Sequence, residues 1–330
     1  MLPKDKDVVI LNFDKLTYSG NLDNLKDIER HKRYSFVRGD ISDQKAVEAA
    51  LKKFNPDFVI NFAAETHVDR SIHVGAKEFI DTNITGVFNI LEAMKGRPKI
   101  KKYVQVSTDE VYGSLSLGSK EKFKESTAFA PNVPYAATKA SGDMLCRAYS
   151  HTFGVPVVVT HCSNNYGPYQ YPEKLIPFFV LRVVEGKPLP IYGDGKNVRD
   201  WVYVLDHCEA LKLCLFKGKP GEVYNICADN ELNNLQITDM ILSYFKKNKK
   251  TNLEFIADRP GHDRRYAIDA AKIKRELGWK PRYDFKKAFK ETIDWYLANK
   301  KWAEKVRQKT GVFNPHIDLW EAHNIPKNKK

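Results

Sequence analysis

The fold is decided by a strand–helix–strand stretch: Tyr103-Val-Gln-Val-Ser107, then Pro134 to Phe153, then Val155-Pro-Val-Val-Val-Thr160. Strands this uniformly apolar are typical of a parallel sheet that is buried on both faces. The alternation extends upstream and predicts a doubly wound α/β fold. Further strands are expected at 8–13, 34–38 and 58–61, and helices at 21–31, 77–94 and from an N-cap at Ser42 to Phe54.

A change in composition after Asn164 predicts a second, smaller domain of mixed structure. Proline and glycine become frequent there, and the expected strands shorten. We assign residues 1–164 to the first domain and residues 165–200 and 229–330 to the second. Segments near 201–228, a helix at 205–216 and a strand at 223–226, return to the first domain.

Composition excludes several classes of protein. The chain has 330 residues, 42% of them apolar, so a sizeable core is available. Its longest apolar run, 176–184, is interrupted by Arg182, and residues 1–7 lack a hydrophobic signal segment, so neither a membrane span nor secretion is expected. Five scattered cysteines without CxxC spacing predict reduced thiols in a cytoplasmic protein and no metal site.

The net charge of +13 raises the question of an anionic partner. Much of the excess comes from lysine clusters at 246–250 and after Lys300. These clusters have no interleaved aromatic residues and match no nucleic-acid-binding module, so we interpret them as a solvated surface. No nucleic-acid partner is expected.

Asp14 ends the first expected strand and is the first candidate for cofactor binding. In a Rossmann-like dinucleotide fold, a carboxylate at this place binds the adenosine ribose and favours NAD over NADP. A glycine-rich turn that meets the pyrophosphate should precede it by about 20 residues. Here the first glycine is Gly20. The first strand, its loop and its helix are therefore missing, and their loss leaves a gap unless the strands ending at Asp14 and Asn61 pair directly.

Two polar groups are candidates for proton transfer. Tyr135 and Lys139 lie at i and i+4 on one helix face, where an ammonium favours the phenolate of a general base. The pairs Tyr192/Lys196, Tyr283/Lys287 and Tyr296/Lys300 share the spacing, so it is not specific alone. Ser107-Thr-Asp-Glu110 follows a strand, where it provides either an acid and a base or a capped turn.

Several segments taken together are more specific. In order along the chain they are DKLTYSGNL (14–22), AAETHVDRS (63–71), STDEVYG (107–113), YAATK (135–139), SNNYGP (163–168), YGDGKNVRDW (192–201) and DRPGHDRRY (258–266). From Val8 to about residue 300 the chain resembles the dTDP-glucose 4,6-dehydratases, which are extended short-chain dehydrogenases/reductases. It departs from them at the missing glycine loop, at Thr66, where the family usually has serine, and in an unassigned tail after Lys300.

The resemblance implies a redox-neutral lyase acting on a nucleotide-linked glucose. Tyr135, with Lys139 and Thr108, would take the C4 hydroxyl proton while NAD accepts hydride; Glu110 would remove the C5 proton, and Asp109 would protonate the departing C6 hydroxyl. It implies a homodimer built on the 77–94 and 134–153 helices. The implied cofactor contacts are Asp14, Lys15, Leu16, Thr17, Asp40, Ile41, Ala63, Ala64, Thr82, Tyr135, Lys139 and Asn165. The implied substrate contacts are Thr66, Thr108, Asn164, Lys174, Leu175, Pro190, Ile191, Tyr192, Arg199, Asn234, Arg259, His262 and Asp263.

Alternatives stay open from the sequence. One is another nucleotide-sugar dehydratase, epimerase or decarboxylase, although the consecutive Thr-Asp-Glu favours dehydration. Another is a binding protein with weak or lost catalysis, which the missing glycine loop favours. We expect instead that the native protein carries roughly 20–25 further residues ahead of Met1 with a glycine-rich start. An intact mass of native material tests this.

Overall fold

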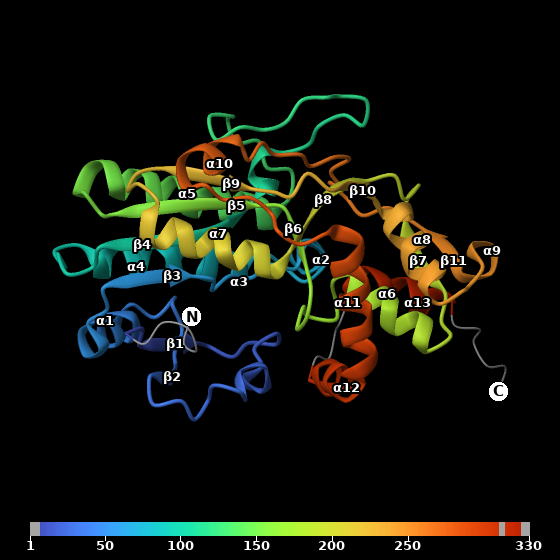
Figure 1. Ribbon diagram of the computed structural model, residues 1–330, viewed down its shortest axis with the longest axis horizontal. Coiled ribbons are helices and arrows are strands. Elements are labelled where there is room, and N and C mark those ends of the chain that lie inside the picture. Colours follow the sequence, from blue (N-terminus) through green and yellow to red (C-terminus); the bar gives the residue numbers. More distant parts are fainter. Residues whose placement is uncertain (1–6, 310–313, 325–330) are drawn as a thin grey trace.

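The computed structural model describes residues 7–309 and 314–324. Four parallel strands form its main sheet in the order β3–β4–β5–β9 (Figure 1). Side chains from alternate positions of β4 and β5 enter two different hydrophobic clusters, so the sheet is buried on both faces. The predicted doubly wound sheet is confirmed. Its strands are β3 (Phe58–Asn61), β4 (Lys102–Thr108), β5 (Val157–Cys162) and β9 (Val223–Ile226).

Helices cover both faces of this sheet. On one face, Tyr103, Val157 and Val159 pack among α1, α4 and α5. On the other, Val104 and Val158 pack with α7 and α10. The bounds are α1 (Gln44–Phe54), α2 (Val68–His73), α3 (Lys77–Ile80), the π-turn η2 (Asp81–Gly86), α4 (Val87–Met94), the 3₁₀ turn η3 (Asp109–Tyr112), α5 (Pro134–Phe153), α7 (Val204–Lys217) and α10 (Ala271–Leu277).

The sheet has a gap on one side of β3. β1 (Ile10–Asp14) pairs only with β2 (Tyr34–Arg38), in parallel and in a sheet of its own. Within the described ranges no ladder joins β1 to β3, and Figure 1 shows the β1–β2 pair (blue) beside β3 without continuing its sheet. Val9, just before β1, is 57% exposed, and Phe62, just after β3, is 63% exposed. Direct pairing of these strands does not replace the missing one.

The remaining elements form a second core built on short mixed sheets. β8 pairs in parallel with β6 and antiparallel with β10, and β7 pairs in parallel with β11. None of the helices in the described ranges meets the length and hydropathy that a bilayer span requires. The bounds are β6 (Asn164–Tyr166), α6 (Leu175–Val184), β7 (Leu189–Tyr192), β8 (Val198–Tyr203), β10 (Glu231–Asn233), α8 (Asn234–Tyr244), α9 (Lys249–Asn252), β11 (Leu253–Ile256), α11 (Phe285–Ala298), α12 (Lys300–Gln308) and α13 (Pro315–Asn324).

Two local predictions were wrong. The helix expected at 21–31 is only the 3₁₀ turn η1 (Leu22–Leu25), because Asn21 caps a single turn and the segment rests against the tail, where Trp302 Nε1 donates to Asn24 Oδ1 at 2.9 Å. The N-cap of α1 is Asp43 rather than Ser42, and its Oδ1 accepts from the Ala46 amide at 3.2 Å. The helix expected at 77–94 is continuous but contains the π-turn η2.

Candidate active site

The end of β4 turns directly into η3 and holds two acidic side chains. Thr108 caps the turn by accepting from the Glu110 amide at 3.3 Å, so the capped-turn interpretation is correct for this residue. Asp109 is 2% exposed, and burial, followed by the charge of Glu110, raises its pKa well above the usual range. Burial also raises the pKa of Glu110, but Arg259 and Arg199 act against this increase. The two neighbouring carboxyls therefore have different environments, as a separate acid and base require.

Tyr135 and Lys139 lie on the first turns of α5, which begins with Pro134, a residue suited to the first helical position. Both side chains are buried, at 6% and 4% exposure. Lys139 Nζ donates to the Val106 carbonyl on β4 at 2.7 Å, and burial lowers its pKa. Burial and then Glu110 raise the pKa of Tyr135, whereas Thr108 acts against them. The pKa of Tyr135 is therefore raised, and the lowering that was expected from Lys139 is wrong.

Besides Tyr135 and Lys139 on α5, the cofactor candidates come from three strand ends, the π-turn and β6. Asp14 Oδ1 accepts from the Leu16 amide at 2.6 Å, and Lys15 Nζ pairs with Asp40 Oδ2 at 2.6 Å. Thus the loops after β1 and β2 are tied together. The other candidates lie on the same chain segments as expected: Ile41 after β2, Ala63 and Ala64 after β3, Thr82 in η2, and Asn165 in β6.

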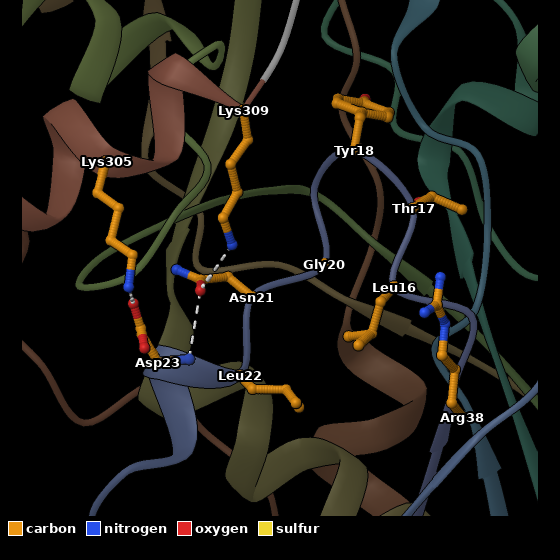
Figure 2. Close-up of a pocket in the computed structure, with 10 residues that line it drawn as sticks. All are labelled: Leu16, Thr17, Tyr18, Gly20, Asn21, Leu22, Asp23, Arg38, Lys305 and Lys309. Atoms are coloured by element: carbon orange, nitrogen blue, oxygen red, sulfur yellow. Dashed lines mark hydrogen bonds and ion pairs between the residues drawn. The ribbon is translucent and has the colours of Figure 1, made fainter.

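The C-terminal tail after Lys300, which the sequence analysis left unassigned, contacts the segment that follows β1. Residues 15–23 of that segment, here called the cofactor loop, include three cofactor candidates. Lys305 pairs with Asp23, and Lys309 Nζ donates to Asn21 Oδ1 at 3.4 Å. A cavity of about 560 Å³ lies between the loop and α12 (Figure 2). Its lining includes two cofactor candidates, Leu16 and Thr17, together with Arg38.

Arg199, which was predicted to bind a diphosphate, is held by backbone carbonyls and an aromatic ring. The alternative of an ion pair with Asp200 is wrong, because Asp200 Oδ1 instead accepts from the amides of Ala228 and Asn230. The Arg199 guanidinium donates to backbone carbonyls of Val198 and Asp263 and lies 4.1 Å from the centre of the Tyr266 ring. No carboxylate in the described ranges forms an ion pair with it, so its charge is available to an anionic ligand.

The other arginine is already paired. Arg259 Nη1 lies 3.1 Å from Asp69 Oδ1, and Tyr192 donates to Asp69 Oδ2 at 2.9 Å. Asp69 was not singled out from the sequence, although it lies within the matched segment 63–71. It holds two substrate candidates from distant parts of the chain in one place.

Tyr266 is a second residue that the sequence did not single out. Its hydroxyl contacts Glu110 Oε2 at 3.4 Å and also donates to Asp263. Asp263 further accepts from Asn132 at 2.6 Å, and His262 Nδ1 lies 2.6 Å from Asp258 Oδ1. The side chains of His262 and Asp263 are therefore held by Asp258 and Asn132, whereas Tyr266 contacts the acid Glu110.

The remaining substrate candidates lie on several elements of the second core and on the segment after β3. Lys174 Nζ donates to the Thr66 carbonyl at 3.4 Å, which joins the segment after β3 to the start of α6. The Asn234 amide donates to the Asn197 carbonyl at 3.1 Å. Asn164 begins β6, Leu175 begins α6, and Pro190 and Ile191 lie in β7.

The residues present fit a dinucleotide at its two ends. Asp14 suits the adenosine ribose, and Tyr135, Lys139 and Asn165 suit the nicotinamide side. Between them, the gap beside β3 is where the fold places its pyrophosphate-binding turn, and the described residues contain no glycine-rich turn there.

A doubly wound sheet with a buried tyrosine–lysine pair beside it defines a short-chain dehydrogenase/reductase. A family profile described as GDP-mannose 4,6 dehydratase matches residues 1–292. The dTDP-glucose 4,6-dehydratase of Xanthomonas campestris pv. campestris is 48% identical over 313 residues, covering 90% of this chain and 88% of that protein.

Two solved structures of dTDP-glucose 4,6-dehydratases are similar to this chain in both fold and sequence. The dTDP-glucose 4,6-dehydratase of Bacillus anthracis in complex with NAD has a TM-score of 0.85, 49% identity and 93% coverage of both chains. The Streptomyces venezuelae enzyme with NAD and TYD bound has a TM-score of 0.86, 43% identity and 90% coverage of both chains. The chain belongs to the dTDP-glucose 4,6-dehydratase family.

Proposed function

We propose that this chain is an NAD-dependent lyase that converts dTDP-glucose to dTDP-4-keto-6-deoxyglucose. The observation that carries the proposal is the convergence of η3, which holds Asp109 and Glu110 after β4, with the contacting helix α5, which has Tyr135 near its start. Relatives that are described as dTDP-glucose 4,6-dehydratases cover at least 90% of the chain. An epimerase needs no acid–base pair for water loss, so this convergence favours dehydration.

Tyr135 acts as the base for the C4 hydroxyl. Its phenolate needs nearby positive charge, because burial raises the pKa of the phenol. Lys139, one turn further along α5, supplies that charge, and Thr108 contributes a hydrogen bond. Bound NAD would accept hydride from C4 and later return it to C6, so that the reaction is redox-neutral overall.

The two acids then divide the elimination. The C4 ketone acidifies the C5 proton, which Glu110 removes; its nearby arginines limit the rise in its pKa and favour the carboxylate. Asp109, whose pKa burial raises well above the usual range, stays protonated and donates to the departing C6 hydroxyl. Water leaves, and the C5–C6 double bond is ready for reduction at C6 and protonation at C5.

We assign the nucleotide sugar to the second domain, residues 165–200 and 229–330. Arg199 would bind the diphosphate through its planar guanidinium. The remaining substrate residues are those named from the resemblance. Asp14, Lys15, Leu16, Thr17, Asp40, Ile41, Ala63, Ala64, Thr82 and Asn165 would line the cofactor.

We also propose a homodimer in the cytoplasm. Three large apolar side chains, Ile80, Phe88 and Met144, are 47%, 38% and 57% exposed on α3, α4 and α5. These are the helices that the resemblance assigns to the dimer interface. Met144→Glu should yield a monomer in analytical ultracentrifugation, and an unchanged dimer would contradict this interface. The five cysteines are free, which suits a reducing compartment.

The test of the function is a comparison of sugar nucleotides. Purified protein with added NAD should form a 4-keto-6-deoxy product from dTDP-glucose at least tenfold faster than from UDP-glucose or GDP-mannose. Tyr135→Phe is the control for contaminating activity. Equal turnover of the three substrates would contradict the assignment to dTDP-glucose.

A further inference from the structure

A buried polar network behind Tyr135 and Lys139 takes no part in the mechanism above. It runs from Asp143 on α5 through His161 on β5 to Tyr112 in η3, and all three side chains are at most 3% exposed. His161 Nε2 lies 3.2 Å from Asp143 Oδ2, and His161 Nδ1 lies 2.6 Å from the Tyr112 hydroxyl. Ser107 also donates to Asp143 Oδ2 at 2.6 Å.

The orientation of Asn225 fixes where the protons lie in this network. Asn225 Nδ2 donates to the Phe123 carbonyl at 3.2 Å, so Oδ1 is the atom that faces the Tyr112 hydroxyl at 2.9 Å. An amide oxygen only accepts, and therefore Tyr112 donates its single proton to Asn225. The Tyr112 oxygen must then accept from His161 Nδ1–H.

The other ring nitrogen completes the assignment. Asp143 Oδ2 as a carboxylate only accepts, so His161 Nε2 also carries a proton. With Asp143 ionised, a neutral imidazole would leave one of the two contacts of His161 without a proton, which is unfavourable in a buried network. The hydrogen-bond geometry thus describes an imidazolium paired with a carboxylate.

We propose that His161 is a positively charged positioning residue that neutralises Asp143 and so leaves the charge of Lys139 available to Tyr135. Its catalytic consequence rests on the proposed function; the protonation of His161 does not. Asp143 lies one helical turn beyond Lys139 on the same face of α5. Unpaired, its negative charge would offset the ammonium and make the Tyr135 phenolate harder to form.

Asp143 also has a favourable effect that explains why it is present. Burial lowers the pKa of Lys139, and Asp143 acts against this lowering. The pair with His161 therefore lets Asp143 keep Lys139 protonated without a net negative charge beside Tyr135. The other titratable groups facing the network are Lys139 and Cys146 on α5, Tyr103 on β4, Asp109 in η3, and Glu125, which accepts from the Asn225 backbone amide at 3.0 Å.

Nitrogen-15 NMR of histidine-labelled protein tests the charge directly, with His161→Gln used for assignment. We expect both ring nitrogens of His161 to be protonated at pH 7.5. A neutral His161 ring at that pH would overturn the proposal. This measurement needs neither cofactor nor turnover, so it holds even if the protein is not a dehydratase.

The pH dependence of kcat/KM for dTDP-glucose tests the catalytic consequence. His161→Gln leaves Asp143 charged, so the acidic limb, which reports the base, should move upward by about one pH unit. The double variant His161→Gln/Asp143→Asn removes both charges and should restore the limb to within about 0.3 unit of its original position. His151→Gln is the matched control.

Each outcome of the comparison of pH profiles either supports or overturns the proposed role of His161. A purely structural role would lower activity without moving the limb and would give no recovery in the double variant, and that result would overturn the proposal. If His161→Gln fails to fold, the double variant still tests the proposal: an upward-shifted limb there would overturn it. If wild-type protein turns over no sugar nucleotide, the proposed function fails and the NMR result alone decides the charge of His161.

Discussion

The main sheet and the separate β1–β2 sheet differ in how completely they are built. β4 has a hydrogen-bonded neighbour on each edge, and six of its seven residues are buried. β1 has a neighbour on one edge only, and none of its five residues is buried. The proposed catalytic groups follow β4, whereas the adenosine candidates follow β1. The proposed chemistry therefore depends on a fully packed strand, whereas the proposed adenosine contacts follow a strand that has no buried residue.

The largest expected effect is a loss of turnover, and it comes from a substitution beside the fully packed strand β4. Tyr135→Phe removes the phenol that takes the C4 proton, so turnover should fall by about 10³-fold while the melting temperature changes little. Single-turnover assays with excess enzyme would measure this. Tyr283→Phe is the control, because it changes another Tyr/Lys pair of the same spacing at a surface position. Equal losses in both variants would refute the assignment.

Glu110→Gln should separate two steps on the same side. C4 oxidation should persist, but removal of the C5 proton should slow by about 10²-fold, because the amide is not a base. Reduced cofactor should then accumulate during turnover and be visible by its absorbance. An inactive variant without this accumulation would place the C5 base elsewhere.

Arg199→Lys should have a smaller effect, confined to binding. Lysine keeps the charge but loses the planar fork and its contact with Tyr266, so KM for dTDP-glucose should rise about tenfold with kcat nearly unchanged. Steady-state kinetics measure both constants. A fall in kcat at constant KM would instead connect Arg199 to the chemical step.

The smallest effects compare the two sides directly by stability. Val158→Ala on β5 removes two buried methyl groups and should lower the free energy of unfolding by about 2 kcal/mol. Val9→Ala, beside the gap, should change it by less than about 0.5 kcal/mol. Urea denaturation measures both values. A cost for Val9→Ala close to that of Val158→Ala would mean that the β1 side is packed in solution.

The elements that the sequence predicted best have a local cause. The strands at 34–38, 58–61 and 223–226 and the helix at 134–153 have the predicted bounds, because apolar periodicity and a proline at the helix start mark them. The prediction of a helix at 21–31 was wrong because this segment contacts the tail about 280 residues later. There Trp302 binds Asn24, and Lys305 pairs with Asp23. Local sequence does not contain that contact.

The residues of the candidate site likewise divide into those that the sequence identified and those that only the structure revealed. Motifs within single segments selected the residues after β4 and at the start of α5, since each motif depends on neighbouring positions. Asp69, Tyr266 and the pair of Asp143 with His161 emerged only from contacts between distant segments.

The sequence by itself determined the alternation of strands and helices and the family. Those properties follow from residue order and periodicity. Only the tertiary structure decided that β1 and β3 stay apart, that the tail borders the cofactor loop, and which side chains surround Lys139. These depend on packing and on hydrogen bonds between groups brought together by folding, and the free energy of such contacts is set by burial and geometry.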